Sequence, residues 1–94
     1  MDRTSDRTAR RIHVVGRVQG VYFRAAARSE AESLGLAGWA HNEPDRSVKI
    51  LVEGDPESIA EFIAWCKHGP PDARVERIEI AEVDITGLDG FHIS

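Results

Sequence analysis

Hydrophobic and polar residues alternate in several short segments of the chain, which is the pattern of strands that bury one face. In segment 47–54, valine or isoleucine occupies every second position, while Lys49, Leu51 and Glu53 point the opposite way. Within residues 78–85, the apolar residues move from even-numbered to odd-numbered positions between Ile80 and Val83. This shift predicts a bulge near residues 81–82. The predicted strands are residues 11–16, 36–42, 47–54 and 74–85, with 91–94 as a short fifth.

Two other segments carry apolar residues three and four positions apart, which predicts helices with one buried face. The first, residues 23–34, ends at Gly35, and the second begins at residue 56 and is stopped by Gly69, Pro70 and Pro71. Asp55 suits the N-cap of the second helix, and Pro56 suits its first helical position. The predicted buried stripes are Phe23, Ala27, Ala31 and Leu34 in the first helix, and Ile59, Phe62, Ile63 and Cys66 in the second.

The elements follow one another as strand, helix, strand, strand, helix, strand, which is the split βαβ arrangement. We therefore predict an α+β ferredoxin-like sandwich (βαββαβ), in which two helices cover one face of an antiparallel sheet of four to five strands. Residues 1–10 are rich in charge and contain no apolar run, so they are expected to form a flexible tail. A single domain is expected over residues 11–94.

The composition narrows the class of protein. Of the 94 residues, 41% are hydrophobic and 30% are charged, which is typical of one small globular domain. The net charge of -4 argues against a general nucleic-acid-binding protein, although it permits a local basic site. The one cysteine excludes an intrachain disulfide and fits the cytoplasm. No run reaches the roughly 18 apolar residues of a membrane span, so no membrane anchor is expected.

Residues 16–24, GRVQGVYFR, join the first predicted strand to the first helix and contain groups that suit an anion. Gly20 can adopt a positive φ, and the backbone amides around it can point into one concavity. The helix adds unpaired N–H groups and the positive end of its dipole, and Arg24 adds a planar fork for two oxygens. Judged from the residues alone, a tight turn in which Arg24 pairs with a neighbouring group is as good an interpretation as an anion-binding loop.

The same nine residues resemble the first signature of the acylphosphatase family, and GWAHN followed by SVKILVEG resembles its second. The resemblance covers residues 11–94. It implies the same fold and the hydrolysis of small acyl phosphates to a carboxylate and inorganic phosphate, without a metal or a cofactor. Arg24 would clamp the phosphoryl group, and Asn42 would position the attacking water. The phosphoryl oxygens would be cradled by the backbone N–H groups of Gln19, Gly20, Val21, Tyr22, Phe23 and Arg24.

The implied reaction suits a site that has neither an acid nor a base. An acyl phosphate expels a carboxylate whose conjugate acid has a pKa of about 4, so the leaving group needs no proton. The amide of Asn42 is not basic and can only orient a water. Catalysis would therefore consist of positioning and charge stabilisation.

One position departs from the family pattern. Arg46 stands four residues after Asn42, where the family usually has a glycine in the turn between the second and third strands. A positive φ at this position would strain an arginine. We therefore predict a turn of a different type, supported by Pro44 and Asp45.

The alternative function is a non-catalytic module that binds a small anion or RNA on the same fold. An RNA-binding sheet stacks bases on aromatic residues of its central strands. The open face is expected to offer His13, Val15, Lys49, Leu51 and Glu53. None of these is aromatic, which argues against RNA. The histidines show no metal-ligand spacing, so no metal is expected. We predict a monomer without a nucleic-acid or membrane partner.

Overall fold

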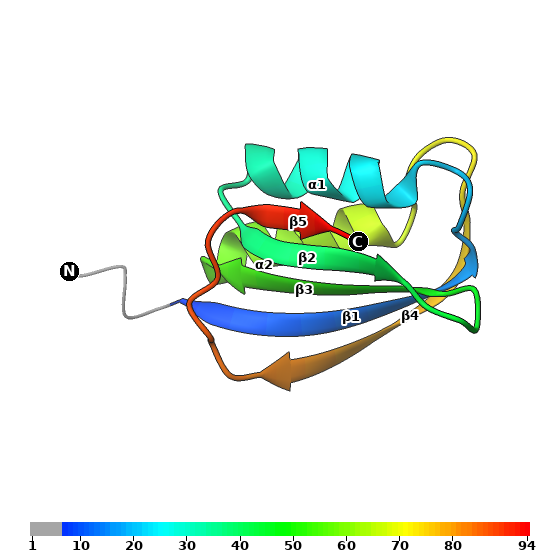
Figure 1. Ribbon diagram of the computed structural model, residues 1–94. Helices are drawn as coiled ribbons and strands as arrows, with labels where there is room; N and C mark the ends of the chain where they lie inside the picture. The colour runs from blue at the N-terminus through cyan, green and yellow to red at the C-terminus, as the bar shows by residue number, and fades with distance from the viewer. Residues whose placement is uncertain (1–6) are drawn as a thin grey trace.

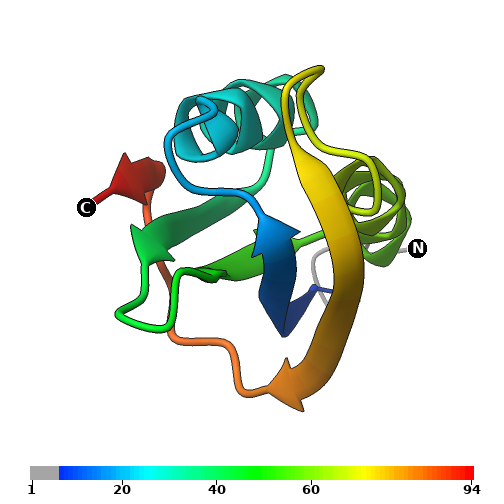
Figure 2. The ribbon, with the colours of Figure 1, turned by 90° about the vertical axis from the view of Figure 1, so that its right-hand side faces the viewer.

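The computed structural model describes residues 7–94, which form five strands and two helices (Figure 1). Both helices lie on one face of a single sheet, as Figures 1 and 2 show together. The predicted α+β ferredoxin-like sandwich is therefore confirmed. The strands are β1 (Thr8–Arg17), β2 (Ala37–Asn42), β3 (Val48–Gly54), β4 (Arg74–Val83) and β5 (Phe91–Ile93), and the helices are α1 (Phe23–Ser33) and α2 (Pro56–Cys66).

The strands lie in the order β4-β1-β3-β2-β5. The first four pair in antiparallel fashion, as predicted. In contrast, β5 runs parallel to β2, with Phe91 opposite Gly38, so the five-stranded sheet is mixed rather than antiparallel. The route of the chain explains this difference: after β4, at one edge, the chain crosses to the other edge and enters β5 beside the start of β2 (Figure 1).

The hydrophobic core lies between the helices and the sheet. Val48, Ile50 and Val52 of β3 are fully buried, as their alternation predicts. Cys66 at the end of α2 is also buried, which confirms it as a core residue. Burial raises the pKa of the Cys66 thiol, and the charge of Glu30 raises it further, so this thiol is not a reactive nucleophile.

The sheet begins earlier in the chain than the sequence pattern indicates. β1 starts at Thr8, three residues before the predicted domain start at residue 11. Ala9 is fully buried and lies opposite Glu53 of β3 and Val83 of β4. Residues 8–10 therefore belong to the sheet rather than to a tail, and residues 1–6 of the predicted tail lie outside the described residues.

The bulge predicted near residues 81–82 is wrong. β4 pairs with β1 in unbroken register through that region, and the register shifts instead between Val15 and Gly16 of β1. The shift of the apolar residues of β4 from one face to the other after Ile80 has another cause. Val83 shares a face with Ala9 and Glu53, and at this end of the sheet that face is covered by the segment between β4 and β5.

Glu53 lies on the face of the sheet away from the helices, as expected, but it is fully buried there rather than open to solvent. Its carboxylate accepts hydrogen bonds from the N–H groups of Thr86 (2.8 Å), Gly87 (3.1 Å) and Leu88 (3.0 Å), and from the Thr86 hydroxyl (2.9 Å). Burial alone would raise the pKa of Glu53, but these four hydrogen bonds together hold it below its ordinary value. The carboxylate thus anchors the segment that leads into β5.

Candidate active site

The loop of residues 18–22 connects the end of β1 to the start of α1 (Figure 2). Gly20 and Tyr22 both have left-handed backbones, with φ of +75° and +64°. No side chain of the described residues caps α1 at Tyr22, which leaves N–H groups of its first turn available to a ligand. The loop and the helix end therefore offer the donors and the positive dipole end that favour an anion.

Arg24, in the first turn of α1, and Asn42, the last residue of β2, line one cavity of about 410 Å³. The fold thus brings together the two residues that the resemblance assigns to phosphoryl binding and water positioning. The remaining lining residues are Val18, Gly20, Tyr22, Phe23, Ala25 and Ile93.

The other predicted cradle residues differ in where they lie. Gly20 and Tyr22 line this cavity, whereas Gln19 and Val21 do not. Phe23 lines it too, but its side chain is buried in the core, where its ring lies 5.3 Å from that of Trp65. A contact between Phe23 and a phosphoryl group could therefore come only from its backbone.

The guanidinium of Arg24 is held by the chain that follows β5. Its Nη1 donates a hydrogen bond to the main-chain oxygen of Ser94. The N–H of Ser94 in turn donates to the carbonyl of Ala40 in β2 (3.1 Å). Arg24 is thereby linked to the strand that ends in Asn42. No pattern in the sequence indicates this contact, because its partners are 70 residues apart.

The side chain of Gln19 braces the loop against the hairpin between β2 and β3. Its Nε2 donates to the carbonyls of Glu43 (2.8 Å) and Ser47 (2.9 Å). Glu43 directly follows Asn42, so the brace connects the loop to the place where Asn42 lies. Sequence reasoning missed this role and assigned only the backbone N–H of Gln19 to the site.

The turn of this hairpin is closed by hydrogen bonds from Arg46 N–H to the Glu43 carbonyl (3.0 Å) and from Glu43 N–H to the Ser47 carbonyl (2.9 Å). Arg46 has a φ of +77°, so the predicted turn that avoids a positive φ is wrong. Pro44 and Asp45 instead fill the centre of a turn that places Arg46 in the left-handed region. Hydrogen bonds from the hydroxyl and N–H of Ser47 to the Asp45 carboxylate support it and lower the pKa of Asp45.

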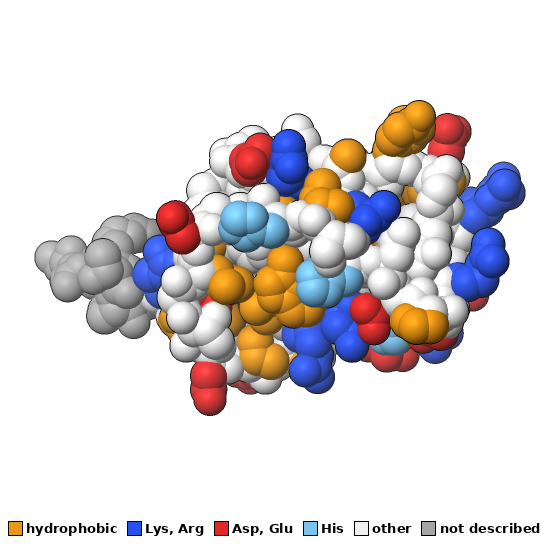
Figure 3. Space-filling view, in the orientation of Figure 1, with side chains coloured by type: hydrophobic (Ala, Val, Ile, Leu, Met, Phe, Trp, Pro, Cys, Tyr) orange, Lys and Arg blue, Asp and Glu red, His pale blue; other side chains and the backbone are white. Residues whose placement is uncertain are grey.

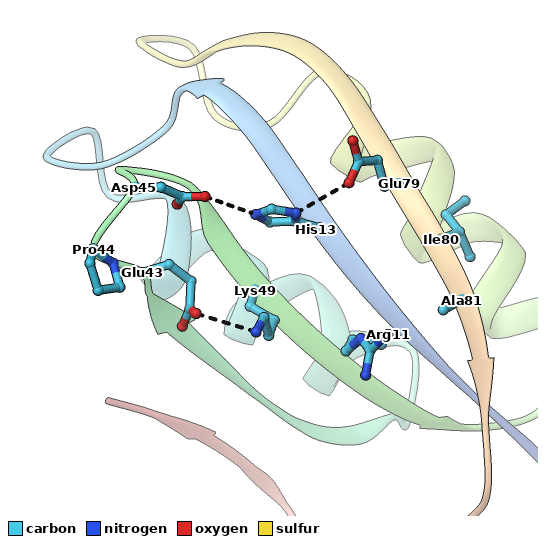
Figure 4. Close-up of a pocket in the computed structure, with 9 residues that line it drawn as sticks. All are labelled: Arg11, His13, Glu43, Pro44, Asp45, Lys49, Glu79, Ile80 and Ala81. Atoms are coloured by element: carbon cyan, nitrogen blue, oxygen red, sulfur yellow. Dashed lines mark hydrogen bonds and ion pairs between the residues drawn. The ribbon is translucent and has the colours of Figure 1, made fainter.

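A larger hollow, of about 640 Å³, lies on the open face of the sheet and shares no lining residue with the loop cavity (Figure 4). In it, His13 lies between Glu79 (Nδ1 to Oε1, 3.3 Å) and Asp45 (Nε2 to Oδ2, 3.7 Å). The ammonium of Lys49 is 3.3 Å from the carboxylate of Glu43. These groups pair with one another and are therefore less available to an anion than the N–H groups of the loop, which leaves Arg11 as the remaining cation of the lining.

The open face carries one aromatic side chain that the prediction missed. The ring of Trp39 stacks on that of His41, with centroids 4.2 Å apart, and both lie on β2 opposite Leu51 and Lys49. Figure 3 shows apolar side chains near the middle of the molecule in this view, bordered by histidines. The strands β1 and β3 contain no Phe, Tyr or Trp. The prediction that the open face has no aromatic side chain is therefore correct for these two strands but wrong for β2.

Residues 7–94 contain no group of three or more His, Cys, Asp or Glu side chains placed to hold a metal ion. Over the same part of the chain, neither helix is long and apolar enough to cross a membrane.

Comparisons with known proteins agree with this geometry. A model of the acylphosphatase family matches residues 10–93. An acylphosphatase of Methylococcus capsulatus is 49% identical over 80 residues, which are 83% of this chain and 87% of the relative. A solved acylphosphatase from Coxiella burnetii aligns with 100% of this chain and 99% of its own, with a TM-score of 0.94 and 31% identity. The acylphosphatase from Bacillus subtilis aligns with 92% of this chain and 97% of its own, with a TM-score of 0.89 and 39% identity.

The family match extends over nearly the whole described chain and includes both Arg24 and Asn42. The fold, the match and the relatives all lead to one conclusion: the chain belongs to the acylphosphatase family.

Proposed function

We propose that this enzyme holds the phosphoryl group of a small acyl phosphate between loop 18–22 and Arg24, and that Asn42 directs a water to the phosphorus. The observation that carries the proposal is that Arg24 and Asn42, from different elements, line one cavity beside Gly20. Membership of the family supports the reaction, and the shared cavity supports the assignment of these residues.

In the proposed reaction, the oxygen of a water attacks phosphorus while the bond from phosphorus to the acyl oxygen breaks. The bonding electrons leave with the acyl oxygen, which becomes a carboxylate. The attacking water loses a proton to a phosphate oxygen of the substrate. The products are a carboxylate and inorganic phosphate, and the leaving group needs no proton because a carboxylate is stable at neutral pH.

The site must chiefly stabilise negative charge on the phosphoryl oxygens. The fork of Arg24 can donate two parallel hydrogen bonds to them, and the loop N–H groups can donate others. The contact with Ser94 restricts the guanidinium before substrate binds, which lowers the entropy lost on binding. Among the described residues that line the cavity, none carries a carboxylate, an imidazole or a thiol, so the substrate phosphate is the natural proton acceptor.

The test follows the loss of benzoyl phosphate by ultraviolet absorbance, first without EDTA and then after EDTA is added. The proteins compared are the unaltered enzyme, Arg24→Gln, Asn42→Ala and the control Arg28→Gln. Arg28 is an exposed arginine one turn further along α1, in a long contact of 3.9 Å with Glu32. We expect kcat/KM to fall about 100- to 1,000-fold in the first two variants, because each loses a group that acts on the transition state. The control is expected to keep its activity.

The outcomes separate the parts of the proposal. Most of the activity surviving in Arg24→Gln would refute the role of Arg24. Loss of turnover on adding EDTA would refute metal independence. Binding of inorganic phosphate without turnover by the unaltered, folded protein would favour the alternative, a non-catalytic anion-binding module.

We further propose that the substrate and product are small molecules, that the chain is a monomer in the cytoplasm, and that neither nucleic acid nor a membrane is a partner. The net charge of -4 and the mutually paired charges on the open face support the absence of an RNA partner. The single, buried cysteine supports a reducing compartment. Light scattering on the eluting protein would test the monomer, and a salt-dependent RNA shift assay would test the absence of RNA binding.

A further inference from the structure

Tyr22 has a backbone that its side chain does not favour. Its φ of +64° and ψ of +23° lie in the left-handed region, which is unusual for a bulky aromatic residue. Glycine or asparagine adopts this conformation with less strain. The local backbone therefore gives no reason for a tyrosine at this position.

Within residues 7–94, the ring of Tyr22 takes no part in the hydrophobic core. The residue is 82% exposed. Over residues 7–94, its side chain makes no hydrogen bond and no ring contact, whereas Phe23, the next residue, is buried against Trp65. Residues held in strained backbone conformations are concentrated at functional sites.

The position of Tyr22 indicates what the ring could contact. Tyr22 lines the same cavity as Arg24 and Asn42, and much of the remaining lining is apolar. A cavity of about 410 Å³ can hold a small organic ligand as well as a phosphoryl group. When the phosphoryl group lies at the loop and Arg24, the acyl group of the substrate extends into the rest of the cavity.

We infer that Tyr22 selects the acyl group: its ring packs against an aromatic or large apolar acyl group and so favours acyl phosphates of that class over small ones such as acetyl phosphate. This inference rests on the proposed function. Contact between an aromatic ring and an aromatic acyl group changes binding by about 3- to 10-fold.

The test compares kcat/KM for benzoyl phosphate with kcat/KM for acetyl phosphate in the unaltered enzyme, Tyr22→Asn, Tyr22→Gly and Tyr22→Phe. Asparagine and glycine tolerate the left-handed backbone but remove the ring, whereas phenylalanine keeps the ring and removes only the hydroxyl. We expect the benzoyl-to-acetyl ratio to fall about 3- to 10-fold in Tyr22→Asn and Tyr22→Gly, mainly through KM, and to persist in Tyr22→Phe.

An unchanged ratio in an active Tyr22→Asn or Tyr22→Gly enzyme would overturn the inference and leave the proposed function standing. Equal losses on both substrates would also overturn it, because the residue would then act only through the loop backbone. Failure of the unaltered enzyme to hydrolyse either substrate would overturn the proposed function itself, and the inference with it.

Discussion

Replacing Glu53 with glutamine tests how the end of the chain is held against the sheet. Each carboxylate oxygen of Glu53 accepts two hydrogen bonds, Oε2 from the N–H and hydroxyl of Thr86, and Oε1 from the N–H groups of Gly87 and Leu88. Glutamine keeps the shape of the side chain but turns one of these acceptors into an NH₂ donor. One pair of donors would then face another donor inside the protein.

The magnitude follows from the two hydrogen bonds that are lost. A buried donor left without an acceptor costs about 1–3 kcal/mol, and local relaxation recovers part of it. We therefore expect Glu53→Gln to lower the free energy of unfolding at pH 7 by about 2–4 kcal/mol. Urea denaturation followed by tryptophan fluorescence measures this difference. Glu61→Gln, at an exposed position of α2, is the matched control and should change stability by less than about 0.5 kcal/mol.

The effect of Glu53 should also depend on pH. The pKa of Glu53 is lower in the folded protein than its ordinary value of 4.5. Its contribution to stability is therefore fully present above pH 4.5 and is lost as the pH falls below 4.5 and through the folded pKa. The difference between the unaltered protein and Glu53→Gln should shrink over that range. A loss of under about 0.5 kcal/mol at pH 7, or a difference independent of pH, would refute this account of Glu53.

Two further substitutions examine the loop and the hairpin beside the cavity. Gln19→Ala removes both hydrogen bonds to the hairpin, so we expect a loss of about 2 kcal/mol in the free energy of unfolding and a fall of about tenfold in kcat. Steady-state kinetics with urea denaturation measures both, and an unchanged kcat would contradict the brace. Arg46→Gly should stabilise the protein by about 0.5 kcal/mol, because relief of the left-handed strain exceeds the added freedom of glycine in the unfolded chain. A less stable variant in the same urea experiment would contradict this reasoning.

The strands and helices with a regular hydrophobic period could be predicted, because the spacing of apolar residues within each element indicates which of its faces is buried. The alternation of Val48, Ile50 and Val52 and the helical spacing of Phe62 and Cys66 correctly identified the buried faces. Their order along the chain was then enough to predict the sandwich, since few topologies accommodate it.

Features that depend on distant segments could not be predicted in this way. Glu53 alternates as an exposed residue would, and it is buried only because residues 86–88 cross over it. The parallel pairing of β5 with β2 and the contact between Arg24 and Ser94 arise from the same crossing. No local pattern encodes them, because each joins parts of the chain separated by more than 30 residues.

In the candidate site, the motifs indicated the residues but not how they are supported. Arg24 and Asn42 could be named from the two signatures, and the structure brings them to one cavity. The side-chain brace of Gln19 was missed because the motif suggests only its backbone. The left-handed backbone of Arg46 was missed because hairpin hydrogen bonds override the intrinsic preference of an arginine.

The central claim is that the site holds the phosphoryl group and directs water to phosphorus rather than to the acyl carbon. Hydrolysis of benzoyl phosphate in water enriched in ¹⁸O, with mass spectrometry of both products, tests it most directly. Attack at phosphorus breaks the bond between phosphorus and oxygen, so the account predicts that the label from water appears in inorganic phosphate and not in benzoate. Label in benzoate would mean that water attacks the acyl carbon, and the roles proposed for Arg24 and Asn42 would then be wrong.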